Sequence, residues 1–348
     1  MVIEQGCNRQ KELSNCTFVK TILMLIVVLY HCMLYWGGSW FIGEPVYAAK
    51  PLGVLAAWLD TFHIYGFTLV SGYLFYALKY EKGKYSKFLS FAINKCKRLL
   101  IPYAFASLIW VIPFAVYFFK YDAGDIIWKY VFGTSPSQLW FLLMLFGVFM
   151  IFYPLSNFFE KHHLGGAVIV LLIYGVGIFG GMVLPNVFQA FRACTYIPLF
   201  WLGFKLRQHG NCRLRKVPTY LWIVADILLF ALARYLSGYN GFIFSLLRLG
   251  LDFVLHIVGA LMAFFVLQKI AGLIRCDERK TLKFLGTHSM TVYLFHQQVV
   301  YVLIHLLNGA VNPYIHSGIN FIGAMLISLL LSMLFMKFKF TRMLIGHK

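Results

Sequence analysis

Long apolar stretches alternate with short polar connections over most of the chain. A helix needs about 20 apolar residues to cross the hydrocarbon core of a bilayer, and ten stretches come close to that length or exceed it. They cover residues 18–36, 52–78, 99–119, 138–158, 164–184, 190–205, 219–237, 247–268, 285–307 and 318–337, of which the sixth is short. The pattern predicts an all-α polytopic membrane protein with about ten transmembrane helices.

The connections between the stretches are too short to form a soluble domain, and the longest of them runs from residue 79 to residue 98. No internal repeat is visible in the sequence. We therefore expect residues 1–348 to form a single membrane domain with no fused soluble domain.

One glycine motif inside the fifth stretch needs a separate interpretation. Gly175, Gly177 and Gly180 match the GxGxxG fingerprint of dinucleotide-binding proteins, but that fingerprint functions between a strand and a helix. Within an apolar stretch, small residues let neighbouring helices approach closely, and Gly177 with Gly181 also forms GxxxG. The motif favours helix packing over nucleotide binding.

Composition agrees with a lipid environment. The chain is 61% hydrophobic and 12% charged, with 18% aromatic residues and a mean hydropathy of +0.76. An average soluble domain is about half apolar and a quarter charged, so this chain lacks the polar residues that would cover a soluble globule. Trp and Tyr collect at membrane interfaces, which accounts for the aromatic content.

The net charge of +19 is distributed unevenly among the connections. The connection 79–98 carries seven Lys and Arg residues, whereas the preceding connection carries only Lys50. Rich and poor connections largely alternate further along the chain, and the segments at both ends are rich. This is the positive-inside pattern of membrane proteins. It predicts that both termini lie in the cytoplasm, and it argues against nucleic acid as a partner.

Ionisable residues inside a bilayer are costly, so each suggests a function. Lys20 and His31 are eleven residues apart, which is about three helical turns or 16 Å, so they share one face of the first helix. Lys20 lies near the cytoplasmic end, where an anionic cofactor can dock, or where it can anchor the helix at the lipid headgroups. His31 lies in the outer half, and we favour a functional role over a bond to neighbouring backbone.

Two further polar groups leave alternatives open. Asp60 and His63 are three residues apart on the second helix, so the carboxylate can orient the imidazole for catalysis, or the two can simply satisfy one another. Lys95, Lys97 and Arg98 precede the third apolar stretch. They can hold phosphates through charge-assisted hydrogen bonds, or they can serve only as a topology signal.

Three arginines lie near the predicted outer ends of helices, against the positive-inside trend: Arg192, Arg234 and Arg248. Binding of an acceptor or an internal ion pair would each account for them. Asp226, Asp252 and His256 lie deeper, and their purpose is not evident from the sequence. The run His296-Gln297-Gln298 favours structural hydrogen bonding.

Several segments together resemble acyltransferase family 3, a family of bacterial membrane O-acyltransferases. That family has a basic residue, ten intervening residues and a histidine on its first helix, as Lys20 and His31 do here. The other similar segments are residues 62–64, 69–75, 95–103, 139–142 and 288–296, in the family's order along nearly the whole chain. The family commonly has Arg where this chain has Lys20 and Lys95, and Lys lacks the planar two-pronged contact of Arg.

The resemblance implies transfer of an acyl group, usually acetyl, from cytoplasmic acyl-CoA to a hydroxyl of a cell-surface carbohydrate or its lipid-linked precursor. It implies His31 as general base or as a covalent acyl relay, with His63 and Asp60 also in the catalytic group. Binding of the acyl donor falls to Lys20, Lys95, Lys97 and Arg98, and binding of the acceptor to Arg192 and Trp140.

The resemblance also implies a place in the bacterial cytoplasmic membrane, where the bilayer surrounds the chain and a separate periplasmic or extracellular partner can assist it. Acyl-CoA serves as a co-substrate, and we expect no permanently bound cofactor and no metal. The main alternative from another class is a transporter or flippase for a polar or anionic solute, because polar residues along a central path serve conduction as well as catalysis.

Overall fold

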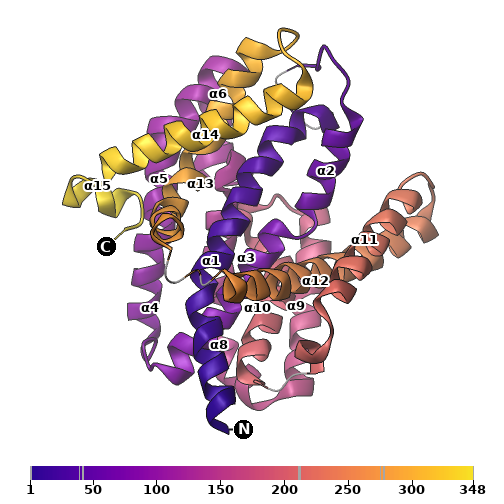
Figure 1. The fold of residues 1–348 in the computed structure, drawn as a ribbon, viewed down its shortest axis with the longest axis vertical. Coiled ribbons are helices and arrows are strands. Elements are labelled where there is room, and N and C mark those ends of the chain that lie inside the picture. The colour runs from indigo at the N-terminus through magenta and orange to yellow at the C-terminus, as the bar shows by residue number, and fades with distance from the viewer. Residues whose placement is uncertain are drawn as a thin grey trace. The chain divides into compact units, whose positions relative to one another are not determined.

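The computed structural model describes residues 2–38, 40, 43–210, 213–274, 276 and 279–347, with side chains from residue 10 onward. All regular secondary structure in this part of the chain is helical (Figure 1). Nine of the described helical segments are long and apolar enough to cross a bilayer. The prediction of an all-α polytopic membrane protein is confirmed.

Each of the ten predicted stretches contains helix. The main helices are α1 (Val2–Leu34), α2 (Lys50–Asp60), α3 (His63–Tyr76), α4 (Phe88–Lys95), α5 (Ile101–Ala106), α6 (Ile112–Phe119), α8 (Trp140–Lys161), α9 (His163–Val183), α10 (Ala190–Gln208), α11 (Thr219–Leu236), α12 (Phe242–Leu273), α13 (Lys280–Leu307) and α14 (Pro313–Phe335). Shorter elements include the four-residue helix α7 (Ala123–Ile126), the C-terminal helix α15 (Lys339–Leu344) and the single turns η1 (Tyr35–Gly37), η6 (Ser137–Leu139), η7 (Val187–Gln189) and η8 (Arg213–Lys216).

The sixth stretch differs from the other nine. It forms α10, but this helix of 19 residues carries Arg192, Lys205 and Arg207, and it is not among the nine apolar spans. Three cations within one helix of this length make it more polar than a typical membrane span.

Two of the predicted stretches are interrupted. The stretch 52–78 breaks after Asp60, so that α2 ends there and α3 begins at His63. The stretch 99–119 contains two π-helical turns, η3 (Cys96–Leu100) and η4 (Ser107–Val111), and two more such turns are η2 (Ala77–Glu81) and η5 (Ile127–Val131). Such wide turns are rare and are often found at functional sites.

The chain divides into two compact units, each built from three segments. The first unit comprises Met1–Tyr30, Val54–Ala77 and Leu199–Gly286, and the second comprises His31–Gly53, Leu78–Pro198 and Thr287–Lys348. The prediction of a single membrane domain over 1–348 stays a prediction, and each unit is described by itself below.

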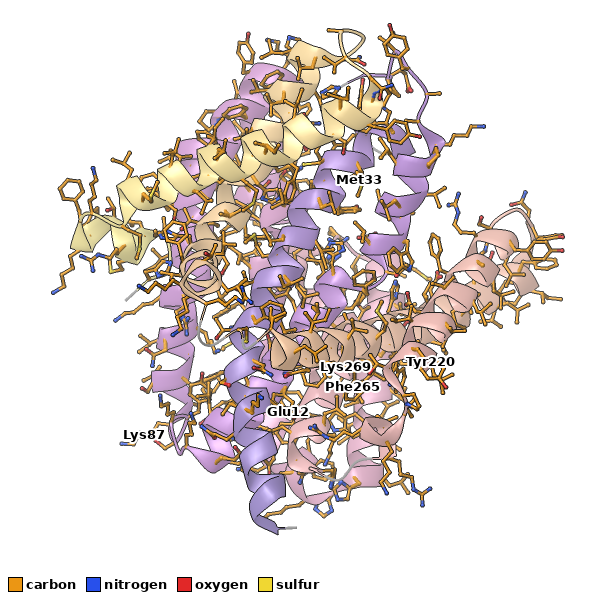
Figure 2. All side chains as sticks on the ribbon, in the orientation of Figure 1. Glu12, Met33, Lys87, Tyr220, Phe265 and Lys269 are labelled. Atoms are coloured by element: carbon orange, nitrogen blue, oxygen red, sulfur yellow. The ribbon has the colours of Figure 1, made fainter. Side chains whose placement is uncertain are left out.

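In the first unit, α12 packs against both α3 and α11. Trp222 of α11 stacks on Phe265 of α12, with 5.7 Å between ring centroids. Phe265 is labelled on α12 in Figure 2. The closest backbone approach joins α3 to the second half of α10. A Cβ atom on Gly72 would lie 1.9 Å from the carbonyl oxygen of Phe200, and one on Gly203 would lie 1.9 Å from that of Leu69. Only glycine fits at these two positions.

In the second unit, α8 packs against α4, α9 and η3, and α15 packs against α5. A Cβ atom on Gly177 of α9 would lie 2.8 Å from the carbonyl oxygen of Phe191 and from the methyl carbon of Thr195, both on α10. The interpretation of the GxGxxG run as a packing surface is confirmed, because the glycine allows α9 and α10 to meet.

Candidate functional site

The most informative contact in the second unit joins two histidines. His31 lies in the last turn of α1, and His296 lies in the middle of α13, fully buried. The His31 Nδ1 and His296 Nε2 atoms are 3.3 Å apart, and the two rings meet edge to face with 4.9 Å between centroids. The sequence favoured a structural hydrogen-bonding role for His296, and the structure adds a bond to the predicted catalytic histidine.

The other nitrogen of His296 faces only backbone oxygen in the contacts that the structure gives it. His296 Nδ1 lies 2.9 Å from the carbonyl oxygen of Tyr293 and 3.1 Å from that of Val292. A carbonyl oxygen only accepts hydrogen bonds, so His296 Nδ1 carries a proton. The hydrogen bonds on the imidazole therefore run in a defined direction.

Aromatic side chains lie beside the histidine pair. The indole of Trp40 is 6.0 Å from the His31 ring and 4.7 Å from the ring of Tyr301, measured between centroids. The amide of Gln297 donates to the Tyr301 hydroxyl at 2.5 Å. His31 is therefore part of a cluster that combines aromatic faces with hydrogen-bonding groups.

Polar contacts also join α13, close to His296, to Gln138 and Trp110. The Gln138 amide donates to the carbonyl oxygen of Leu294 at 3.0 Å and to the Gln298 side chain at 2.8 Å. The Tyr293 hydroxyl donates to the backbone oxygen of Gln138, and Trp110 donates to the carbonyl oxygen of Phe295 at 3.0 Å. Four residues of α13 close to His296 are thus bonded to neighbouring elements of the second unit.

The predicted donor-binding cations of the second unit occupy one helical turn but have different surroundings. The Lys95 ammonium, at the end of α4, lies 3.5 Å from the ring centroid of Phe149 and over the rings of Tyr85 and Phe91. A cation over aromatic faces is stabilised electrostatically. Lys97 and Arg98, in the π-helical turn η3, have exposed side chains. The structure thus separates a packed lysine from two exposed cations.

The C-terminal segment lies against this turn. A Cβ atom on Gly346 would lie 3.1 Å from the carbonyl oxygen of Arg98. Burial lowers the pKa of His347, and the neighbouring His288 and Arg98 side chains lower it further. The neutral form of His347 is therefore the one favoured beside the cationic turn.

The predicted acceptor-binding residues Arg192 and Trp140 lie together in the second unit. The guanidinium carbon of Arg192 is 4.5 Å from the centroid of the Trp140 indole. Arg192 is held at the start of α10, where the Asn186 side chain accepts from the backbone N–H groups of Phe191 and Arg192. Arg192 is exposed, so one edge of this stacked pair faces outward.

Asp60 and His63 both belong to the first unit. His63 is 2% exposed, and its Nδ1 lies 2.6 Å from the carbonyl oxygen of Leu59. The His63 Nε2 and Asp60 Oδ1 atoms are 3.9 Å apart, and the Asp60 side chain is 60% exposed. The predicted pair is close, but this distance is too long for a hydrogen bond, and the break between α2 and α3 separates the two residues.

Lys20 also belongs to the first unit, on an uninterrupted α1 that continues to His31, so the prediction that one helix carries both is confirmed. Its side chain is half-buried and lies one turn beyond the buried Cys16. His31 belongs to the second unit.

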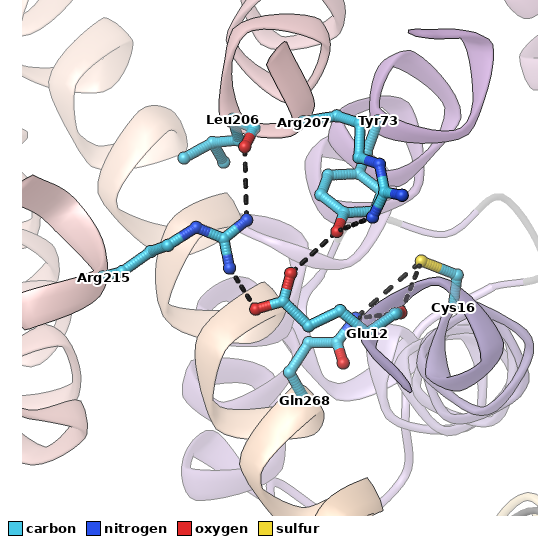
Figure 3. Close-up of polar contacts among 7 residues, drawn as sticks. All are labelled: Glu12, Cys16, Tyr73, Leu206, Arg207, Arg215 and Gln268. Carbon is cyan, nitrogen blue, oxygen red and sulfur yellow. Dashed lines mark hydrogen bonds and ion pairs between the residues drawn. The ribbon is translucent and has the colours of Figure 1, made fainter. Parts of the chain in front are cut away.

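Sequence analysis missed a polar network in the first unit (Figure 3). The Tyr73 hydroxyl donates to the Glu12 carboxylate at 2.7 Å and accepts from Arg207 at 3.0 Å. Arg215 forms an ion pair with the other Glu12 oxygen and donates to the carbonyl oxygen of Leu206. Gln268 of α12 donates to the Glu12 backbone oxygen at 3.0 Å. The sequence signal was Glu12, which with Glu4 is one of two acidic residues in a basic N-terminal segment.

This network has a clear electrostatic effect. Burial alone would lower the pKa of Arg215, but the adjacent Glu12 carboxylate outweighs it and raises the pKa. Arg207 is buried as well. The basic connections were interpreted above only as a topology signal, whereas the structure makes Arg207 and Arg215 part of a hydrogen-bonded connection among α1, α3, α10 and η8.

The deeper polar residues are also in the first unit. Asp226 is fully buried and accepts from the indole of Trp58 at 2.8 Å. His256 stacks on Tyr65 with 3.8 Å between centroids. Arg248 donates to Ser245, and Arg234 is exposed. Within the described residues, no group of three or more His, Cys, Asp or Glu side chains is placed to hold a metal ion.

Comparison with known protein families gives one match. Residues 15–337 match a family model described as Acyltransferase domain, so the match runs through both compact units. No curated protein and no solved structure gives a significant match.

Proposed function

Because the chain belongs to acyltransferase family 3, whose domain matches residues 15–337, we propose that it moves an acyl group from cytoplasmic acyl-CoA to a carbohydrate hydroxyl. The chain is a membrane acyltransferase, which sets aside the alternative of a transporter. An acetyl group is the proposed acyl group, and a cell-surface polysaccharide or its lipid-linked precursor is the proposed acceptor. The proposed location is the bacterial cytoplasmic membrane, with both termini inside.

The observation that carries this proposal is the pairing of His31 with His296 in the second unit. A general base needs an imidazole nitrogen with a lone pair and a fixed ring orientation. The hydrogen bond between His31 and the buried imidazole of His296 supplies the orientation. Histidine suits this role because its ordinary pKa of about 6.5 lies near neutrality, whereas those of lysine and the carboxylates do not.

The proposed reaction needs one proton carrier. His31 Nε2 takes the proton of the acceptor hydroxyl while that oxygen attacks the carbonyl carbon of the thioester. The carbon–sulfur bond then breaks, and the leaving CoA sulfur takes the proton from the His31 imidazolium. The products are an O-acyl ester and CoA thiol, and His31 returns to its neutral form. The reaction as written needs no oxidant, reductant or further cofactor.

A covalent relay uses the same nitrogen. In that scheme His31 Nε2 attacks the thioester, and CoA leaves as its thiolate from an N-acyl imidazolium. The acceptor hydroxyl then takes the acyl group, the imidazole returns to its neutral form, and the hydroxyl proton goes to the CoA thiolate or to water. Exposing the protein to labelled acetyl-CoA without acceptor distinguishes the two schemes, because label bound to His31 supports the relay. A ternary-complex kinetic pattern without labelled protein supports direct transfer.

The acyl donor carries phosphates, and the proposed contacts for them are cations. Lys97 and Arg98 are exposed in the π-helical turn η3, which supports their role as phosphate ligands. Lys95 is proposed to contribute through its charge, since its ammonium already lies over three aromatic rings. Lys20 is proposed as a further cation for the donor from the first unit.

The acceptor is proposed to meet Trp140 and Arg192. An indole face binds the apolar face of a sugar ring, and a guanidinium donates to hydroxyl or carboxylate oxygens. The stacking of Arg192 on Trp140 at 4.5 Å supports a shared role for this pair. Asp60 and His63 stay in the proposal as a second polar pair from the first unit. A separate periplasmic or extracellular partner is proposed to assist on the outer side.

The test is release of CoA by the full-length protein in lipid nanodiscs, supplied with acetyl-CoA and a polysaccharide acceptor. We expect acceptor-dependent release that His31→Ala reduces by at least about 10², a typical contribution of general acid–base catalysis. The control is His162→Ala, because His162 is exposed in the turn between α8 and α9. Equal turnover in wild type and His31→Ala would show that His31 is not the base.

A further inference from the structure

The structure assigns to His296 the role of a positioning residue that selects the tautomer of His31. This inference rests on the proposed function, because it concerns how His31 is prepared to act as the base. It follows from which ring nitrogens donate and which accept in His31 and His296, two residues of the second unit that are 265 positions apart.

The first step is the proton on His296. Its Nδ1 lies within hydrogen-bonding distance of two carbonyl oxygens, at 2.9 Å and 3.1 Å. Neither oxygen can donate, so Nδ1 carries the proton. His296 is fully buried, and burial of an unpaired charge is expensive. A neutral His296 with a proton on Nδ1 has its lone pair on Nε2.

The second step transfers this constraint to His31. The lone pair on His296 Nε2 faces His31 Nδ1 at 3.3 Å. Two lone pairs facing each other at this distance would repel, so His31 Nδ1 is the donor. In neutral His31 the proton then sits on Nδ1, and Nε2 holds the lone pair. This is the nitrogen that the proposed reaction requires, for both the direct and the relay scheme.

The third step is the rigidity of His296 itself. The two carbonyl oxygens that accept from Nδ1 belong to Val292 and Tyr293, one helical turn earlier on α13. The same part of α13 is bonded to Gln138 through Leu294 and Gln298. His296 is thus held from its own helix and cannot exchange Nδ1 for Nε2 by a ring flip without losing these bonds.

His296 plays the part that a carboxylate plays in other enzymes, where it accepts a hydrogen bond from the catalytic imidazole. Here the acceptor is a neutral imidazole. In the Ser-His-Asp triad, replacing the Asp acceptor by Asn favours the wrong tautomer of the histidine and lowers kcat by about 10⁴. A neutral imidazole acceptor stabilises the developing imidazolium less than a carboxylate does. We therefore expect loss of the His296 acceptor to lower kcat by about 10² to 10⁴.

Two substitutions distinguish the effect of the hydrogen-bond acceptor at position 296 from the effect of side-chain volume there. His296→Gln keeps an amide oxygen near the position of Nε2 and an amide N–H for the helix carbonyls. His296→Leu has a similar size but neither group. We expect His296→Leu to lower kcat by at least about 10² with KM for acetyl-CoA unchanged, and His296→Gln to recover at least a tenth of wild-type kcat.

The decisive measurement reads the tautomer directly in the resting protein. Histidine labelled with ¹³C and ¹⁵N gives distinct imidazole shifts for the Nδ1–H and Nε2–H forms, and comparison with His31→Gln identifies the His31 signals. We expect Nδ1–H on His31 in wild type and in His296→Gln, and a gain of Nε2–H in His296→Leu. Size-exclusion chromatography of each variant in detergent shows whether it is folded.

Each outcome has a defined meaning. An Nε2–H form of His31 in wild type overturns the inference, and so does an unchanged His31 tautomer in a folded His296→Leu. Because the spectrum needs no substrate, it is independent of the proposed reaction. If the tautomer behaves as expected while His31→Ala retains full turnover, the hydrogen-bond assignment stands and the proposed catalytic role of His31 fails.

Discussion

Glu12 and Arg215 form an ion pair although 203 positions separate them in the chain. The two side chains are each 17% exposed, and the Glu12 carboxylate also accepts from Tyr73. The pair fastens the first part of α1 to η8 within the first unit, and α1 is the helix that carries both Lys20 and His31. Its removal should therefore affect the stability of the unit before it affects chemistry.

Replacement of one partner leaves the other charge largely buried, which is more destabilising than loss of the pair itself. We expect Glu12→Gln to lower the free energy of unfolding by about 1–3 kcal/mol. Arg215→Met should have a similar effect, and the double variant should lose less than the sum of the two. Thermal unfolding in one detergent measures all three.

The matched control is Arg213→Met, because Arg213 lies in the same turn with an exposed side chain. It should unfold within about 0.5 kcal/mol of wild type. Strict additivity of Glu12→Gln and Arg215→Met would show that the two residues are not coupled.

The three cations around η3 should respond differently to substitution. Lys97→Ala and Arg98→Ala remove exposed charges, and each should raise KM for acetyl-CoA by about 10-fold with little change in stability, since a charge-assisted hydrogen bond contributes about 1.5–3 kcal/mol. Lys95→Met removes an ammonium that packs on Phe149. It should lower thermal stability and raise KM less.

Initial rates at varied acetyl-CoA, repeated at increasing salt, measure these effects. Salt screens exposed charges more than buried ones, so the wild-type KM should rise with salt and the KM of the double variant of Lys97 and Arg98 should rise less. The same KM in Lys97→Ala, Arg98→Ala and wild type would remove η3 from the donor site.

Trp140 and Arg192 should affect the acceptor rather than the donor. Trp140→Leu removes the indole face beneath the Arg192 guanidinium, and it should raise KM for the polysaccharide by about 10-fold or more, as loss of a stacked aromatic does at a hot spot. KM for acetyl-CoA should stay the same. Arg234→Ala is the control, because Arg234 is an exposed arginine of the first unit. A rise in KM for both substrates would indicate a general disturbance of the fold.

Apolar runs predicted a helix in all ten stretches, and nine of the described helical segments have the length and apolarity that a bilayer imposes on each helix independently. The runs did not predict the break after Asp60 or the π-helical turn at Cys96, since these depend on packing against other elements. The relation between Lys20 and His31 could be predicted because both residues lie within one helix. The contact of His31 with His296 could not be predicted, because a contact between residues 265 positions apart leaves no periodic signal.

Charge patterns were similarly limited. The positive-inside pattern treats the basic residues of a connection alike and uses only their side of the membrane. The contacts of Arg207 with Tyr73 and of Arg215 with Glu12 depend on how α10 and η8 approach α1 and α3. Arg192 and Trp140 were both expected to bind the acceptor, but no sequence pattern predicted that they stack on one another, and that contact came from the structure.

The glycines at the contact between α3 and α10 should be the least replaceable in the first unit. A Cβ atom on Gly72 would lie 1.9 Å from the carbonyl oxygen of Phe200, which is backbone and cannot rotate away. Gly72→Ala should therefore force the two helices apart, and overpacking of this kind costs about 1–3 kcal/mol or more. Gly203→Ala meets Leu69 in the same way and should have the same effect.

Gly250 in α12 gives the matched control, because a Cβ atom there meets nothing within 4 Å. Alanine has the higher helix propensity by about 1 kcal/mol, so Gly250→Ala should be neutral or stabilising in thermal unfolding, while Gly72→Ala and Gly203→Ala should be strongly destabilising. The contrast separates the contact from the general effect of replacing glycine in a helix. If Gly72→Ala unfolded at the wild-type temperature, the close approach of α3 to α10 would be wrong.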